Sequence, residues 1–117
     1  MALKSQGIEY DVYTKFFDRC DRAICESRRG IYKVQCAKGT DKILGATFVG
    51  GPAGELICQI TQAMVHNLGL GKLGDSIYPY PTYSESIGHM ANYQYKPKYL
   101  IKVSDKGIRE GMKDVEE

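Results

Sequence analysis

The sequence contains no tryptophan and no run of apolar residues approaching the ~20 that a membrane-spanning helix needs. Its first eleven residues lack both the basic stretch followed by an apolar run and the small-residue cleavage site of a secretory signal. Lys and Arg total 16 against 14 for Asp and Glu, and the basic residues are scattered rather than clustered. We therefore expect a soluble, intracellular protein of the cytoplasm, with no membrane partner and no nucleic-acid partner.

Motifs for metal, redox or nucleotide chemistry are also scarce. The four cysteines include no CxxC pair and have no histidine near them in the chain, so we expect no metal site. Cys20 and Cys25 have a spacing that redox disulfides use, but no glycine-rich turn or helix N-terminus accompanies them, and a structural role is favoured. Gly50–Gly54 resembles a phosphate loop without the Lys-Ser/Thr or G-x-G-x-x-G pattern that nucleotide binding requires.

The 117 residues, 43% of them apolar and 26% charged, fit one compact domain. Alternating β-branched and aromatic residues predict a strand over residues 8–17 and an antiparallel hairpin over 31–49. A long helix is predicted from Pro52, ending at Gly69 and Gly71. Its apolar residues recur at spacings of three and four, namely Leu56, Ile57, Ile60, Ala63, Met64 and Leu68.

The second half of the chain begins with an extended segment, because two prolines forbid a helix over residues 77–81. Thr82 and Glu85 have the spacing of a capping box, which predicts a second helix from Tyr83 into the region of Tyr93. Residues 99–103 are expected to add a short strand before a loose tail. This order predicts an α+β domain, with a small antiparallel sheet covered on one side by helices, over residues 1–97, followed by a partly disordered extension over 98–117.

Two histidines and a tyrosine cluster are the candidate functional residues that the pattern itself offers. His66 lies near the end of the long helix, where interaction with the helix dipole explains it. His89 follows Glu85 by four residues and can pair with it across one helical turn. The tyrosines of the proline-rich segment suit either a contact surface or packing on the domain's own sheet, and they are Tyr78, Tyr80 and Tyr83.

Three motifs in one order carry a family resemblance. They are the strand ILGATFVG, the A-G-E entry to the long helix, and the P-T-x-x-E pattern at Pro81–Glu85. Over about residues 2–95 the chain resembles the C-terminal dimerisation domain of FAD-dependent pyridine nucleotide-disulfide oxidoreductases, the family of glutathione reductase, dihydrolipoamide dehydrogenase and mercuric reductase. The YPYPTYSE form resembles the mercuric-reductase-like branch, and the domain's first family strand is missing.

The resemblance implies roles for particular residues. The family's acid/base dyad falls on Tyr80 and Glu85, with the usual histidine replaced by Tyr80, and a tyrosine of ordinary pKa near ~10 is a poor base at neutral pH. Tyr80 and Pro81 would lie beside the flavin of a partner subunit in a parent enzyme. The implied dimer-interface residues are Ile60, Ala63, Met64, Tyr78, Tyr80 and Tyr83.

The function implied by the resemblance is therefore dimerisation rather than catalysis by this chain alone. FAD and NAD(P)H are expected in the parent enzyme and no cofactor in this chain. The expected partners are a second copy and the FAD and NAD(P) domains, and an enzyme activity requires that the flavin come from another polypeptide. The alternative is a stand-alone small-molecule or metal-binding domain on the same scaffold, with a site lined by Tyr78, Tyr80, Glu85 and His89.

Overall fold

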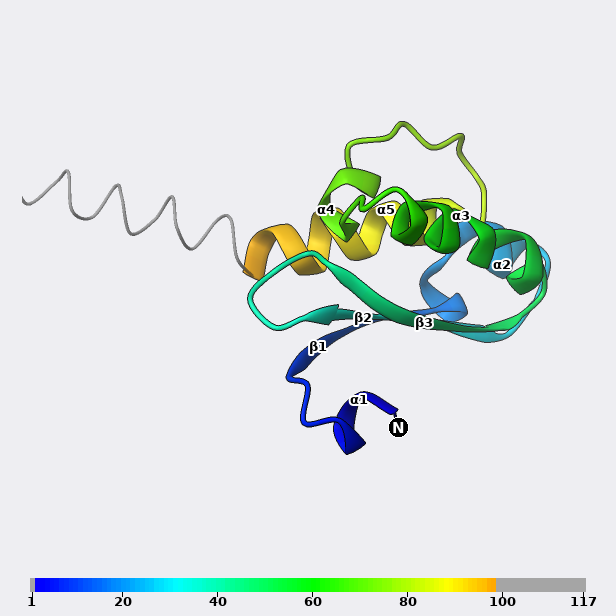
Figure 1. Cartoon of the computed structure of the whole chain (residues 1–117). Coiled ribbons are helices and arrows are strands. Elements are labelled where there is room, and N and C mark those ends of the chain that lie inside the picture. The colour runs from blue at the N-terminus through cyan, green and yellow to red at the C-terminus, as the bar shows by residue number, and fades with distance from the viewer. Residues whose placement is uncertain (1, 99–117) are drawn as a thin grey trace, which may run out of the picture.

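The computed structural model describes residues 2–98, and it contains one sheet with helices packed on it (Figure 1). Its elements are α1 (Ala2–Ser5), β1 (Tyr10–Phe16), the short 3₁₀ turn η1 (Phe17–Arg19), α2 (Asp21–Cys25), β2 (Gly30–Ala37), β3 (Ile43–Gly50), α3 (Ala53–Val65), α4 (Leu70–Leu73), α5 (Glu85–His89) and the π-helical η2 (Met90–Tyr95). The strands pair antiparallel in the order β1-β2-β3. The predicted α+β class is confirmed, while the strand expected over 99–103 lies outside the described residues.

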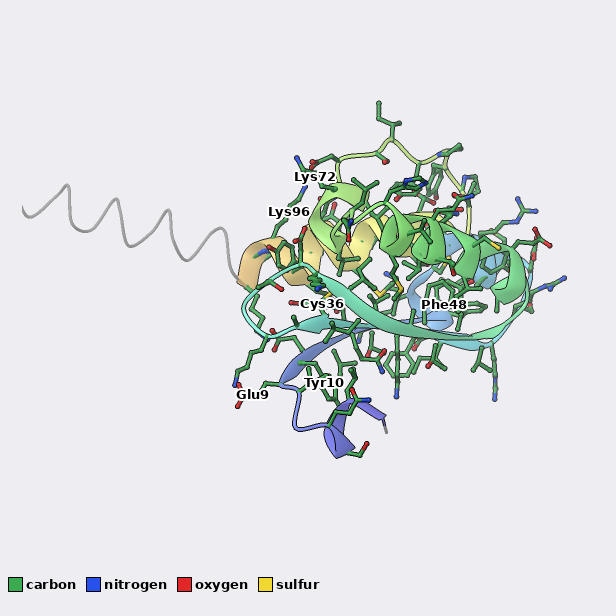
Figure 2. All side chains as sticks on the ribbon, in the orientation of Figure 1. Glu9, Tyr10, Cys36, Phe48, Lys72 and Lys96 are labelled. Carbon is green, nitrogen blue, oxygen red and sulfur yellow. The ribbon has the colours of Figure 1, made fainter. Side chains whose placement is uncertain are left out.

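The sheet separates a covered face from an open one. Figure 1 shows α3, α4, α5 and η2 over one face, with α1 on the other side. Side chains alternate accordingly along β2, where Tyr32, Val34 and Cys36 are buried. Figure 2 shows Cys36 and Phe48 on the helix side of the sheet and Tyr10 on the opposite side. The predicted hairpin is confirmed, with its strands at Gly30–Ala37 and Ile43–Gly50.

Aromatic rings form the centre of the core. Tyr32 stacks on Phe48 with ring centroids 4.3 Å apart and meets Phe17 edge to face at 4.7 Å. Phe17 in turn contacts Tyr83 at 5.3 Å. Such aromatic contacts add roughly 0.5–1.5 kcal/mol beyond the burial of their area. These rings thus link the covered face of β2 and β3, through η1, to the segment that precedes α5.

Helix α3 is confirmed, but its predicted end is wrong. Leu56, Ile60 and Ala63 are buried against the sheet, as the spacing predicted. The helix stops at Val65 because Asn67 takes the left-handed conformation, at φ 54°, that commonly ends helices. The Leu68 N–H then donates to the Ala63 carbonyl at 2.8 Å, which completes the capping pattern.

The glycines expected to end α3 have other places in the fold. Gly69 precedes α4, and Gly71 lies within it. Met64 and Leu68, predicted on the apolar stripe, are 39% and 46% exposed; Met64 lies within the last turn of α3, whereas Leu68 follows the end of the helix. The face of α3 that covers the sheet is therefore narrower than the six-residue pattern suggested.

The capping box forms only in part. Glu85 Oε2 accepts the Thr82 backbone N–H at 3.1 Å, as predicted. The Thr82 hydroxyl instead donates to the Pro79 carbonyl at 2.7 Å, so it does not cap the helix. Helix α5 begins at Glu85 and continues directly into η2, which confirms a second helix that reaches past Tyr93.

The free edge of β1 is closed by one side chain of η2. The Gln94 amide donates to the Thr14 carbonyl at 2.7 Å and accepts the Thr14 N–H at 3.1 Å. This pairing imitates a neighbouring strand at the middle of β1. An edge strand with unpaired backbone groups is open to aggregation, and the amide removes that opening at Thr14.

We expect Gln94→Ala to lower the free energy of unfolding by about 1–2 kcal/mol, because both hydrogen bonds to Thr14 are lost. Urea denaturation followed by circular dichroism measures the change. Gln62→Ala is the matched control, because Gln62 is an exposed glutamine of α3. Equal destabilisation by the two substitutions would contradict the role assigned to the Gln94 amide.

Candidate functional site

The proline-rich segment of residues 77–84, here called the tyrosine arm, passes along the outer side of the helical layer (Figure 1). Its three tyrosines have different surroundings. The Tyr78 hydroxyl donates to the Leu73 carbonyl at 2.8 Å, and its ring lies against Gly88, where any side chain would collide with it. Tyr83 is buried, whereas Tyr80 is 71% exposed. Tyr80 is therefore the arm tyrosine most accessible to another molecule.

Tyr80 is held by a carboxylate that makes it a weak base. Its hydroxyl donates to Asp21 Oδ2 at 2.7 Å. This hydrogen bond and the negative charge of Asp21 raise the pKa of Tyr80 above its usual value. A phenol with a raised pKa stays protonated at neutral pH, so Tyr80 can donate a hydrogen bond but cannot accept a proton in place of a histidine.

Tyr83 anchors the end of the arm to the loop that follows α2. Its hydroxyl donates to Glu26 Oε2 at 2.7 Å, and burial is the main reason that the pKa of Tyr83 is raised. Glu26 also accepts a hydrogen bond from Arg22 at 2.6 Å and forms an ion pair with Arg28 at 3.1 Å. The Tyr83 hydrogen bond, followed by the Arg22 contact, lowers the pKa of Glu26. The carboxylate stays charged and keeps the arm in place.

A cavity of about 290 Å³, here called the arm cleft, lies between the arm, α5 and the start of α2. Besides Arg19, its walls are Cys20, Asp21, Tyr80, Glu85, Ser86 and His89. The cleft thus joins the two dyad positions, Tyr80 and Glu85, with His89. Tyr78, the fourth residue of the expected ligand site, lines a separate cavity beside α3.

Two polar groups of the arm cleft are notable. The Ser86 hydroxyl is buried, with 1% of the residue exposed, and among the described residues it has no hydrogen-bond partner. Buried polar groups are nearly always paired, so an unpartnered hydroxyl in the wall of a cleft is unusual. Burial and the charge of Lys15 lower the pKa of His89, although Glu85 acts in the opposite direction.

Within residues 2–98 no group of three or more His, Cys, Asp or Glu side chains is placed to hold a metal ion. All four cysteines are free in this structure, with Cys20 and Cys36 buried and Cys25 and Cys58 exposed. The Cys20 thiol donates to the Thr82 carbonyl at 3.8 Å, which is a structural contact. His66 stands at the C-terminal cap of α3, as the sequence predicted.

The expected interface residues divide by exposure. Ile60 and Ala63 are buried between α3 and the sheet, and Tyr83 packs against Phe17. These three residues belong to the core and are not exposed to a second copy of the chain. Met64 and Tyr80 are exposed.

The sequence analysis missed two strongly exposed apolar residues, Val65 at 70% and Ile77 at 97%. Neither belongs to an apolar periodicity, and only their exposure in the fold identifies them.

With this geometry described, comparison with known proteins gives the family. Residues 1–91 match the dimerisation domain of pyridine nucleotide-disulphide oxidoreductases. The chain therefore belongs to that family, which confirms the resemblance seen in the sequence. In the described part of the chain, no helix has both the length and the apolar character required to cross a membrane.

Relatives of known activity include dihydrolipoyl dehydrogenase of Mycoplasma pneumoniae, 33% identical over 74% of this chain and 19% of its own. Mercuric reductase of Serratia marcescens is 32% identical over 69% of this chain and 18% of its own. The two sequence identities are nearly equal, so they do not assign the chain to the dihydrolipoyl dehydrogenase branch or to the mercuric reductase branch. The chain spans about a fifth of the length of the relatives it matches.

Solved structures show the same fold. LpdA of Mycobacterium tuberculosis superimposes with a TM-score of 0.72 at 24% identity, covering 79% of this chain and 20% of its own. The copper complex of the HOCl-induced flavoprotein disulfide reductase RclA of Escherichia coli also gives 0.72 at 24% identity, covering 80% and 21%. The three-stranded sheet with its helices is thus the fold of a part of these reductases.

Proposed function

We propose that this chain is the subunit-contact domain of a flavin-dependent disulfide oxidoreductase, in which two copies pair through the outer side of α3 and the tyrosine arm. Membership of the dimerisation-domain family is the observation that carries the proposal. The apolar residues left exposed near the end of α3 and along the arm support it, and they are Met64, Val65, Leu68 and Ile77.

The energetic reason is the cost of leaving these side chains in water. Fully burying one Val, Leu, Ile or Met side chain is worth roughly 1.5–3 kcal/mol, and a small domain has little stability to spare. A second copy that covers Val65 and Ile77 would remove this surface from water. The buried residues beneath, Ile60 and Ala63, hold α3 on the sheet so that the outer face is rigid.

FAD and NAD(P)H belong, in this proposal, to other domains of the enzyme. The string G-x-G-x-x-G does occur at Gly69–Gly74, but it follows helix α3 and surrounds the four-residue helix α4 instead of joining a strand to a helix, so it lacks the setting of a dinucleotide-binding fingerprint. By resemblance to the family, Tyr80 and Pro81 would lie beside the flavin of a partner subunit. Because its hydroxyl is committed to Asp21, Tyr80 would position the arm there rather than exchange protons.

Light scattering across a tenfold concentration range tests the pairing. We expect the full chain to form a dimer that Val65→Lys and Ile77→Lys each weaken at least about tenfold, the change for a loss near 1.4 kcal/mol. Lysine suits the end of a helix, so Val65→Lys should keep the fold. Val12→Lys, at an exposed residue on the open face of the sheet, is the control. A monomer at every concentration, or equal effects at all three sites, would refute the proposal.

A stand-alone ligand-binding domain remains the second candidate, because Ser86, whose buried hydroxyl has no partner among the described residues, lines a cavity with other polar side chains. A ligand that binds only the folded chain raises the melting temperature by mass action. A thermal-shift screen of small polar compounds would favour this candidate if one raised the melting temperature of the wild type but not of Ser86→Ala.

A further inference from the structure

A second and larger cavity adjoins the arm cleft on the side of β1. Its volume is about 630 Å³, and it shares Arg19 and His89 with the arm cleft. We call it the basic groove and define it by Lys15, Phe16, Arg19, His89 and Tyr93, which come from β1, η1, α5 and η2. Residues from the two halves of the chain therefore meet here.

The charge of the groove is unbalanced. Lys15 and Arg19 have no carboxylate partner in the described part of the chain, and no acidic residue lines the groove. The two acids of the adjoining arm cleft, Asp21 and Glu85, keep their negative charge but do not line the groove. Asp21 accepts the Tyr80 hydroxyl and Glu85 accepts the Thr82 N–H. Two cations around one concave surface favour the binding of an anion.

Aromatic rings stand at the edge of the same groove. Tyr93 is 74% exposed and Phe16 is about half exposed, although both are large apolar side chains. His89 meets Tyr93 edge to face, with ring centroids 5.4 Å apart. The contact orients the Tyr93 ring while leaving most of the side chain exposed, and exposed aromatic faces bind flat rings by stacking.

We propose that the basic groove binds a flat aromatic molecule that carries a negative charge, with its ring against Tyr93 and Phe16 and its charge beside Lys15 and Arg19. The cations then gain charge-assisted hydrogen bonds, and two exposed aromatic side chains are covered by the same ligand. The groove lies within a single copy of this chain. The inference is therefore independent of the proposed dimerisation, and either can fail without the other.

His89 lines the groove, so the pKa of its imidazole is sensitive to a charge bound there. The charged or titratable side chains that face it are Lys15 and Arg19 on one side and Asp21, Tyr80 and Glu85 on the other, with Tyr93 following on its own helix. An anion bound beside Lys15 would offset the positive charge that disfavours the imidazolium. Binding should therefore move the His89 titration toward higher pH.

Nuclear magnetic resonance of the full chain provides the test, with adenosine 5′-monophosphate as the probe. We expect millimolar probe to shift the imidazole signals of His89 and to raise its titration midpoint, while the signals of His66, at the C-terminal cap of α3, stay unchanged. Adenosine lacks the anion and inorganic phosphate lacks the ring, so each should bind at least about tenfold more weakly. If either bound as well as the nucleotide, or if none moved His89, the proposal would be overturned.

Substitutions locate the site. Lys15→Gln and Arg19→Gln should each weaken binding about tenfold, which is the loss of one charge-assisted hydrogen bond, and Tyr93→Leu should weaken it similarly. Lys72→Gln is the matched control, because Lys72 is an exposed lysine of α4 away from the groove. These side chains are at the surface, so the fold should survive. A loss of binding in Lys72→Gln equal to that in Lys15→Gln would also overturn the proposal.

Discussion

Gly30→Ala should lower the free energy of unfolding by about 3 kcal/mol or more, whereas Gly45→Ala should change it by less than about 1 kcal/mol. Both glycines lie in strands of the hairpin. A Cβ at Gly30 would collide with the Val49 carbonyl oxygen and stand 2.7 Å from the Phe17 ring. The nearest atom to a Cβ at Gly45 is the end of the Gln35 side chain at 3.5 Å, which is an ordinary contact.

The Gly30 clash cannot be relieved cheaply, because neither neighbour is free to move. The Val49 carbonyl belongs to the paired strand β3, and the Phe17 ring is held between Tyr32 and Tyr83. A loss of this size is a large part of the total stability of a small domain. Urea denaturation followed by circular dichroism would show it, and equal midpoints for the two variants would contradict the packing described.

The second large effect concerns two residues of one helix. Ile60→Lys should prevent folding, at a cost of about 4 kcal/mol or more, because it removes a core side chain and buries a charge without a partner. Val65→Lys should leave the fold intact, since Val65 is 70% exposed, and should act on self-association alone. The pair therefore separates residues that hold the domain together from residues available to a second copy.

Circular dichroism and the dispersion of amide signals measure folding in both variants, and light scattering measures association. If Ile60→Lys unfolded cooperatively at a midpoint near that of the wild type, the assignment of Ile60 to the core would be wrong. If Val65→Lys lost its fold, the outer side of α3 would be part of the core rather than a contact surface. The same experiment thus tests the fold and shows whether Val65→Lys is folded, which the light-scattering test of dimerisation requires.

Much of the fold could be predicted because the signals are local. In β1 and the hairpin, successive side chains point to opposite faces of the sheet, so apolar residues alternate with polar ones. In α3, the buried residues Leu56, Ile60 and Ala63 recur with the period of the helix. The end of α3 could not be predicted in the same way. Asn67 adopts the left-handed conformation that glycine usually takes, and the glycines two and four residues later concealed this.

The site was only partly predictable, because its residues come from distant parts of the sequence. The spacing of Tyr80, Glu85 and His89 identified residues that do line one cleft, but Cys20 and Asp21 reach it from the other half of the chain. The basic groove has no sequence signature, because Lys15 and Arg19 lie more than seventy residues before Tyr93. Convergence of this kind depends on how η2 packs along β1.

The order of the elements and the family motif at Pro81–Glu85 were readable from the chain alone, since periodicity and local spacing express them. The burial and the hydrogen-bond partners of the three arm tyrosines could not be read from the sequence. Tyr83 meets Glu26 and Tyr80 meets Asp21 across 57 and 59 residues, respectively. Whether a phenol is buried, anchored or exposed is decided by such distant partners, because burial and charge depend on what the fold brings near it.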